Sequence, residues 1–250
     1  MNVAIHPTAI IGAGADLGAG VEVGAFTIIE AGTVIGDHAI IGSHCHMGVP
    51  SLAGGDKPLR IGAGARIRSH SIFYAGSIFG DGLVTGHRVT VRERTVAGVG
   101  LQLGTLCDLQ GNCVIGDHVR FHSNVHIGQH SRIGDFVWIF PYVVLTNDPH
   151  PPSATQIGCT IGDFAAVATM SVVLPGVAVG RGALVGASTL VREAVPDDMI
   201  CVGNPGRIVG ETSRIRFRDS GLPAYPWRRH FHRGYPDDVV ARWKAEFPDG

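Results

Sequence analysis

The sequence predicts an all-β protein in which the chain winds into a parallel β-helix of about ten hexapeptide coils. The first observation is an apolar residue at every sixth position between residues 61 and 145, with Thr85 and Ala97 as the two weak members. The second is a column of small or apolar residues four positions later. A helix repeats its apolar residues every 3.6 positions and a strand every 2, so a period of six indicates coils that build one prism side per repeat. The 36 glycines fit this fold, because tight corners need φ values that a Cβ atom disfavours.

Two further stretches keep the same period and set the predicted domain limits. Apolar residues recur at every sixth position from Ile5 to Met47, and again from Ile161 to Val191. Repeats of this kind stabilise one another only through their neighbours, so all coils should form one continuous body. We therefore predict a β-helix domain over residues 1–208 and a tail over residues 209–250.

The six-residue register breaks twice, and each break predicts a loop that protrudes from the coils. The first loop covers residues 48–60 and contains two prolines and a Gly-Gly pair, and the second covers residues 146–160. Long loops in compact repeat proteins often carry function. Both interpretations stay open for the first loop, which is either a lid over a site between subunits or an unstructured surface turn.

The tail contains one short predicted helix. Residues 235–238 read Tyr-Pro-Asp-Asp, which places proline in the first turn and acidic residues at the positive end of a helix. Val239, Val240, Trp243 and Phe247 then fall on one face at helical spacing. Residues 214–218 alternate and suit either a strand or the edge of a helix. We expect the helix to pack on the end of the solenoid or on a neighbouring subunit.

Composition restricts the possible partners and the compartment. The 20 basic and 21 acidic residues leave no bulk charge that would favour nucleic acid. The first residues lack the basic and apolar regions of a signal peptide, and no run is long enough to span a membrane. The five cysteines form no CxxC pair, and three of them fall in the inward small-residue column. They predict buried free thiols and a cytoplasmic location.

The candidate catalytic pair is His126 with Asp108. His118, His122, His126 and His130 lie four residues apart, but in coils this spacing does not put them on one face. Residues 18 apart stack on successive coils at about 4.8 Å, which places His126 on Asp108. A carboxylate beside an imidazole fixes its tautomer and raises its basicity, as a general base requires. The alternative is a surface His–Asp pair without consequence.

Other polar residues are candidates for binding a substrate. Asn147 and Asp148 end the second segment and could bind a polar substrate at a subunit seam, or could simply form a turn. Glu93 lies 36 residues before Gln129, in the same column, and could border the same cleft. It could equally form a surface ion pair with Arg92 or Arg94.

Basic residues near the last coil are candidates for binding the phosphates of a nucleotide-bearing cofactor. Arg192 and Arg207 carry the planar fork that suits phosphate, and Asn204 lies in the turn before Arg207. We assign Gly186 of the last coils to the same cofactor site. Glycine-rich pieces elsewhere lack the strand and helix that a dinucleotide loop needs.

The periodic region resembles the left-handed β-helix acyltransferases, and within them the sugar-nucleotide N-acyltransferases. The stretches that carry this resemblance are 85–93, 119–125, 138–148, 174–177 and 202–205. The resemblance implies a homotrimer, with acetyl-CoA or another acyl-CoA in the groove between two subunits and a nucleotide-linked amino sugar at its inner end. Our candidate catalytic residues are His126, Asp108 and Asn124, and our candidate substrate-binding residues are His87, Glu93, His122, Gln129, Asn147 and Asp148.

One position departs from the resembled pattern. UDP-N-acetylglucosamine acyltransferases carry a motif similar to Asn-x-His-Ile-x-His, whose second histidine is the base, whereas this chain has Gln129 there. Glutamine takes no proton at neutral pH, which counts against O-acyl transfer of that type. An amine nucleophile needs less help, so N-acetyl transfer remains consistent.

Three other functions stay as alternatives. A γ-type carbonic anhydrase shares the fold, but its three zinc-binding histidines have no matching positions here, and we expect no metal. An O-acyltransferase acting on a small acceptor is the second alternative. A non-catalytic trimeric scaffold is the third, and the cluster of His, Asn and Asp residues argues against it.

Overall fold

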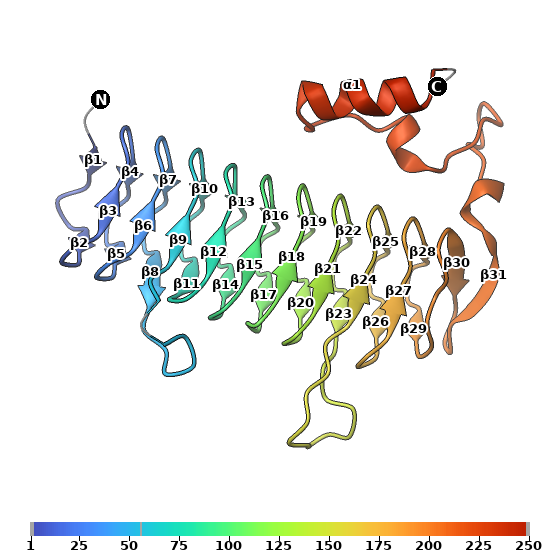
Figure 1. The fold of residues 1–250 in the computed structure, drawn as a ribbon, viewed down its shortest axis with the longest axis horizontal. Helices are drawn as coiled ribbons and strands as arrows, with labels where there is room; N and C mark the ends of the chain where they lie inside the picture. Colours follow the sequence, from blue (N-terminus) through green and yellow to red (C-terminus); the bar gives the residue numbers. More distant parts are fainter. Residues whose placement is uncertain (1–2, 56, 249–250) are drawn as a thin grey trace.

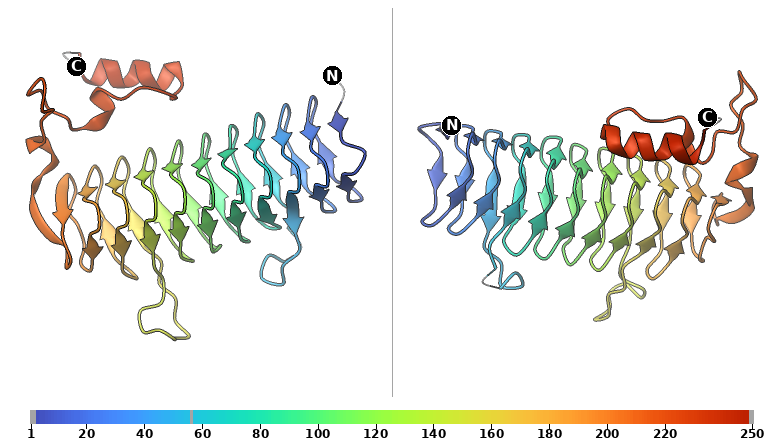
Figure 2. Two further views of the ribbon diagram at one scale, coloured as in Figure 1. Left: turned by 180° about the vertical axis from the view of Figure 1, so that it is seen from behind. Right: turned by 45° about the horizontal axis from the view of Figure 1, so that its top comes forward.

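The computed structural model describes residues 3–55 and 57–248. Asp56 of the first predicted loop and the outermost residues of both predicted domains lie outside the described residues. Within these ranges the chain forms a three-sided parallel β-solenoid, with two loops protruding from one edge and a tail that folds back along another (Figures 1 and 2). The predicted all-β parallel β-helix is therefore confirmed.

Three sheets form the sides of the solenoid, and most of their strands are two residues long. Sheet A consists, in spatial order, of β1 (Ala4–Ile5), β4 (Glu22–Val23), β7 (Ile40–Ile41), β10 (Arg66–Ile67), β13 (Val84–Thr85), β16 (Gln102–Leu103), β19 (Arg120–Phe121), β22 (Trp138–Ile139), β25 (Ala166–Val167), β28 (Leu184–Val185), β30 (Met199–Val202) and β31 (Arg207–Glu211). Sheet B consists of β2 (Ile10–Ile11), β5 (Ile28–Ile29), β8 (His46–Val49), β11 (Ile72–Tyr74), β14 (Thr90–Val91), β17 (Asp108–Leu109), β20 (His126–Ile127), β23 (Val144–Leu145), β26 (Val172–Val173) and β29 (Leu190–Val191). Sheet C consists of β3 (Asp16–Leu17), β6 (Val34–Ile35), β9 (Arg60–Ile61), β12 (Ile78–Phe79), β15 (Val96–Ala97), β18 (Val114–Ile115), β21 (Arg132–Ile133), β24 (Thr160–Ile161) and β27 (Ala178–Val179).

The predicted sixth-residue column fills the interior of the prism. Its weak members are as buried as the rest, with Thr85 at 1% and Ala97 at 5% exposure. The second column is buried too and includes Cys45, Cys107 and Cys113. All five cysteines are buried free thiols, as predicted. The compartment stays a prediction.

Four-residue corners join the sheets, and we name each corner by the sheets it connects. Residues 122–125 form an A-to-B corner, residues 128–131 a B-to-C corner and residues 134–137 a C-to-A corner. The third residue of a corner adopts the left-handed conformation, as Asn124 does with φ 60° and His130 with φ 65°. The four clustered histidines therefore lie on separate corners or strands and share no face, as predicted.

Both predicted loops leave the solenoid at B-to-C corners, and Figure 1 shows both of them protruding from the lower edge, several coils apart. The first joins β8 to β9, and the second joins β23 to β24. The first loop bends back onto the solenoid, because a Cβ added at Gly76 would meet the carbonyl oxygen of Gly54 at 2.9 Å. It is therefore a packed element and not an unstructured turn.

The hairpin of β30 and β31 closes the C-terminal end of sheet A. The two strands are antiparallel, and β30 pairs in parallel with β28. The predicted boundary after residue 208 falls inside β31, because this strand extends the sheet before the tail departs. The short helices η1 (Thr212–Arg214) and η2 (Trp227–Arg229) follow. Residues 214–218 form neither a named strand nor an α-helix, apart from a single bridge between Arg216 and Pro223.

The predicted helix is α1 (Asp237–Glu246), and it packs along the side of the solenoid (Figure 2). Val239 and Trp243 are buried with Tyr235 against Phe136 and Phe164 of two C-to-A corners. The expected docking on the solenoid end was wrong, because these outward aromatic side chains offer an apolar surface on the side. No helix in the described part of the chain is long and apolar enough to cross a membrane.

Docking of the tail should weaken as the pH falls. His118 stacks on Phe136 at 5.2 Å and meets Tyr235 edge-on, and burial lowers its pKa below the ordinary value of 6.5. The charged groups that face it are Arg120, which opposes its protonation, and Asp117, Asp135 and Asp238, which favour it. The imidazole binds a proton more readily when the tail is undocked. The contribution of neutral His118 to tail docking is therefore fully present above pH 6.5 and is lost as the pH falls below this value. We expect faster proteolysis of the tail at about pH 5 than at about pH 7.5.

A variant separates this effect from general acid sensitivity. His118 occupies a left-handed position with φ 54°, which asparagine tolerates, so His118→Asn removes the titration without straining the corner. The pH dependence of tail proteolysis should shrink in this variant. An unchanged pH dependence would assign the effect to other groups.

Candidate functional site

The centre of the candidate site is a hydrogen-bonded pair on the outer face of sheet B. His126 on β20 lies directly opposite Asp108 on β17, and their side chains meet with Nδ1 3.1 Å from Oδ2. A carboxylate only accepts hydrogen bonds, so Nδ1 donates its N–H to Asp108, and in the neutral imidazole Nε2 is the nitrogen with the lone pair. The His126 side chain is 40% exposed. This is the arrangement of an oriented general base.

Asp108 is held in its ionised form by its neighbours. The hydrogen bond to His126 is the largest cause of its lowered pKa, and Gln110 contributes by donating its Nε2–H to Oδ2 at 2.6 Å. The charge of Arg92 on the preceding coil acts in the same direction. Sequence reasoning missed Gln110, although its position two residues after Asp108, directly after the strand β17, was a usable signal.

The spacing of 18 residues places this pair, as predicted. The register runs from Asp108 through His126 to Val144 on successive strands of sheet B. The residues that follow them, Leu109, Ile127 and Leu145, are fully buried and anchor the strands. The pair therefore stands on a rigid part of the solenoid.

The A-to-B corners carry three of the other candidates. Asn124 donates its backbone N–H to Thr105, and its left-handed φ gives it a clear role in the corner. His122, in the same corner, stacks on Phe140 at 4.8 Å, and burial followed by the charge of Arg120 lowers its pKa. His87 lies two coils earlier, with its Nδ1 2.8 Å from Ser69 Oγ. His122 and Asn124 thus flank the strand of His126 on one side.

The B-to-C corners carry the candidates on the other side of His126. Gln129 lies in the corner of the same coil, and the backbone carbonyl of Asn147, one coil later, accepts a hydrogen bond from Ile157 at the neck of the second loop. Asp148 is committed to its own loop, because its oxygens accept from His150 N–H and from both Ser153 donors, which lowers its pKa. The turn interpretation thus describes Asp148 in this structure.

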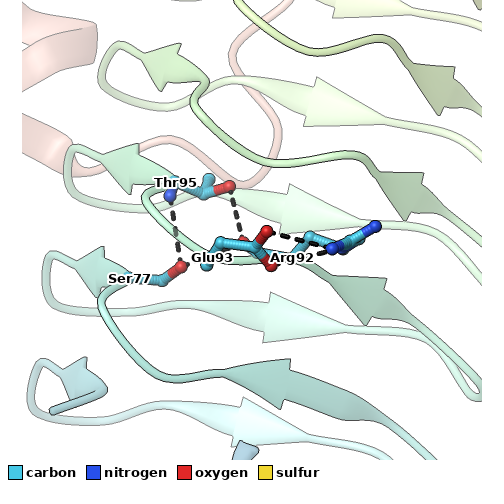
Figure 3. Close-up of polar contacts among 4 residues, drawn as sticks. All are labelled: Ser77, Arg92, Glu93 and Thr95. Atoms are coloured by element: carbon cyan, nitrogen blue, oxygen red, sulfur yellow. Dashed lines mark hydrogen bonds and ion pairs between the residues drawn. The ribbon is translucent and has the colours of Figure 1, made fainter. Parts of the chain in front are cut away.

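Glu93 requires a correction, because it lies beneath the surface. Its side chain is only 2% exposed and receives two hydrogen bonds from the Arg92 guanidinium at 3.0 and 3.2 Å (Figure 3). The carbonyl of Arg92 in turn accepts from Ser77 and Thr95. Glu93 therefore forms a buried ion pair that shapes the corner, and it does not border an open cleft. The cause is the first loop, since Gly54 packs over its Cβ.

The four cofactor candidates gather at the C-terminal end of the solenoid. Gly186 lies in the last A-to-B corner, and Arg192 follows β29. Asn204 and Arg207 belong to the turn of the final hairpin, where Gly206 N–H donates to the carbonyl of Leu190 on β29. Both arginine side chains are exposed, as phosphate binding would need. From β20 to β29 the distance is three strand spacings, or about 14 Å.

Metal ligands are a separate question. Across residues 3–55 and 57–248, no group of three or more His, Cys, Asp or Glu side chains could hold a metal ion.

Similar proteins were found for part of the chain. No family model matches the chain. A serine acetyltransferase of Bacillus pumilus is 34% identical over 120 residues, which are 48% of this chain and 50% of that protein. A 2,3,4,5-tetrahydropyridine-2,6-dicarboxylate N-acetyltransferase of Staphylococcus aureus is 30% identical over 93 residues, 37% of this chain and 33% of that protein. The chain spans about half or less of the length of these curated relatives.

A solved structure shows the same fold along nearly the whole chain. The crystal structure of a UDP-N-acetylglucosamine acyltransferase from Bacteroides fragilis superimposes with a TM-score of 0.57 over 98% of this chain and 92% of that one, at 18% identity. The six-residue repeat, the three-sheet solenoid and the similarity to named acetyltransferases agree with one another. Together they fit the hexapeptide-repeat acyltransferase superfamily.

Proposed function

We propose that this chain is an acyl-CoA-dependent acyltransferase in which His126 is the general base. The observation that carries the proposal is the His126–Asp108 pair, in which Nδ1 contacts the carboxylate and the imidazole side chain is 40% exposed. Nε2 takes a proton from the acceptor as its nitrogen or oxygen attacks the thioester carbonyl. The bond from carbon to sulfur then breaks, and the sulfur leaves with the proton from His126. Asp108 stabilises the imidazolium between these steps.

We propose the amino group of a nucleotide-linked amino sugar as the acceptor and acetyl-CoA as the acyl donor. The sequence stretches that resemble sugar-nucleotide N-acyltransferases support this choice, and so does Gln129 in place of a second histidine. One relative is named an N-acetyltransferase. O-acetyl transfer to a small hydroxyl acceptor is the second candidate. The complete His–Asp pair favours it, because a hydroxyl needs a base, and other relatives are named serine acetyltransferases.

We also propose a homotrimer with the acyl-CoA between subunits, its phosphates on Arg192 and Arg207. An exposed apolar column on sheet C supports association, with Ile78, Val96 and Val114 each 44–45% exposed on successive strands. Contiguous apolar columns of this kind mark contacts between proteins. Light scattering should give three times the chain mass of 26.3 kDa, and a monomer mass would contradict this proposal.

A thiol-release assay with acetyl-CoA tests the reaction. The acceptor panel contains nucleotide-linked amino sugars, free amino sugars and small hydroxyl compounds such as serine. An amide product supports the first candidate, and an ester that hydroxylamine cleaves supports the second. Absence of thiol release with every acceptor would overturn the proposed function.

Substitution of Asp108 should reduce the rate without abolishing it. In Asp108→Asn the amide cannot stabilise the imidazolium, so we expect kcat to fall about 10- to 100-fold. Asp16→Asn is the matched control, an exposed outward position on a strand of sheet C. A kcat that stays at the wild-type value in Asp108→Asn would contradict the role of Asp108.

A further inference from the structure

A pocket with aromatic walls lies between sheet A and the tail. It has a volume of about 330 Å³ and is lined by His122, Trp138, Phe140, Ala166, Tyr225, Trp227, Phe231 and Arg233. The solenoid provides the first four of these residues and the tail the other four. Six of the eight carry aromatic rings or an imidazole, and all but Ala166 are at least partly exposed.

The rings form a floor with upright walls. His122, Phe140 and Trp138 form the floor, with neighbouring ring planes 12° and 26° apart. Phe231 and Trp227 stand nearly perpendicular to Trp138, at 87° and 80°. Such a shape accepts a flat ring that stacks on the floor while its edges touch the walls.

Hydrogen bonds fix these rings in place. Trp138 donates its indole N–H to Tyr235, and Trp227 donates its own to the carbonyl of Phe164, both at 2.9 Å. Arg120 donates to the carbonyls of Arg233 and Gly234 and holds the tail against sheet A. The pocket is therefore organised before any ligand enters, which lowers the entropy lost on binding.

A second hollow of about 450 Å³ continues from this pocket along sheet A. The two share His122, Trp138 and Arg233, and the second also contains Arg68 and Arg120. Gln102, Thr105 and Ser123 add neutral polar groups there. Neither lining, as far as the described residues go, contains an Asp or a Glu. An aromatic pocket thus opens into a groove of positive charge.

We propose that this double hollow binds a nucleotide, with the base in the aromatic pocket and the phosphates on Arg233 and Arg68. Stacking on fixed aromatic rings accepts any flat base, and the arginine fork suits phosphate. A cationic ligand would meet Arg120, which already lies 4.9 Å over the Trp138 ring. A purely apolar chain would leave the arginines without partners.

Two ligands of the proposed reaction carry this chemistry, the nucleotide part of acyl-CoA and that of a nucleotide-linked acceptor. The inference takes these two sources from the proposed function, but the binding groups do not include His126. The A-to-B corner at residues 122–125 joins the pocket to the strand of His126, because His122 belongs to the pocket lining. A nucleotide bound there would lie on the sheet A side of the solenoid, one corner away from the strand of the proposed catalytic base.

Calorimetric titration of the whole chain with nucleotides tests the proposal without any turnover. The probes are UDP, ADP and CoA, with uridine, adenosine and pyrophosphate as partial ligands. We expect a diphosphate nucleotide to bind at least about tenfold more tightly than its nucleoside or pyrophosphate, because both parts of the hollow contribute. Preference for UDP assigns the site to the acceptor, and preference for ADP and CoA assigns it to the acyl donor.

Two substitutions locate the binding. Arg233→Ala removes an exposed side chain and keeps the carbonyl that Arg120 contacts, and Phe231→Ala removes one wall. Each should weaken nucleotide binding about tenfold, while Arg242→Ala, at an exposed position of α1, should leave it unchanged. Proteolysis of the tail verifies that Phe231→Ala remains docked. The proposal is wrong if no nucleotide binds, or if both variants bind as the wild type does. It is also wrong if they change the oligomer mass without changing nucleotide binding.

Discussion

Replacement of His126 by alanine should reduce kcat about 10²- to 10⁴-fold, the contribution typical of a positioned general base. The acceptor would then have to lose its proton to water, since no other imidazole lies on the outer face of this part of sheet B. His122 stacks on an aromatic ring in one flanking corner, and His130 is in the opposite corner. KM for acetyl-CoA should change little, because the predicted cofactor residues lie about 14 Å away. Steady-state kinetics at several pH values measures both parameters.

The control for this variant is His130→Asn. His130 belongs to the same coil, is exposed and occupies a left-handed corner position that asparagine tolerates. It should retain wild-type kcat. If His126→Ala keeps kcat within about threefold of wild type, the base is dispensable and catalysis depends on positioning alone. With an amine acceptor such a result would preserve the reaction class, whereas with a hydroxyl acceptor it would contradict the mechanism.

The sequence predicts those features that repeat with a fixed period. The six-residue columns define the core, and the 18-residue offset brings Asp108 beneath His126, because each coil adds the same number of residues. The 3.6-residue pattern likewise predicts α1, whose buried residues are Val239 and Trp243. These features depend only on neighbours in the chain or on adjacent coils.

Contacts between distant segments could not be predicted in this way. Burial of Glu93 depends on the path by which the first loop returns over its corner, and no periodicity records that path. Tyr235 reaches Trp138 across 97 residues, and Gly234 reaches Arg120 across 114. The aromatic pocket depends on these contacts. From the sequence, the docking of the tail was predictable only as an apolar face on a helix, without the surface against which that face packs.

Replacement of Trp243 by alanine should undock the tail and leave the solenoid intact. Trp243 is 5% exposed and meets Tyr235 at 4.8 Å, Phe136 at 5.2 Å and Trp227 at 5.6 Å between ring centroids. Truncation of a buried tryptophan typically costs about 3–5 kcal/mol. We expect the free energy that holds a short tail on the solenoid to be smaller than this cost.

The reason to expect a local effect is that Trp243 belongs to a separate hydrophobic cluster. The core of the prism and the cluster around Trp243 share no buried residue. Limited proteolysis should therefore release the tail of Trp243→Ala rapidly, while the thermal transition of the solenoid moves little. The exposed neighbour in Lys244→Ala should behave as wild type. A large drop in the solenoid transition itself would show that tail and coils unfold as one cooperative unit, and independent docking would then be wrong.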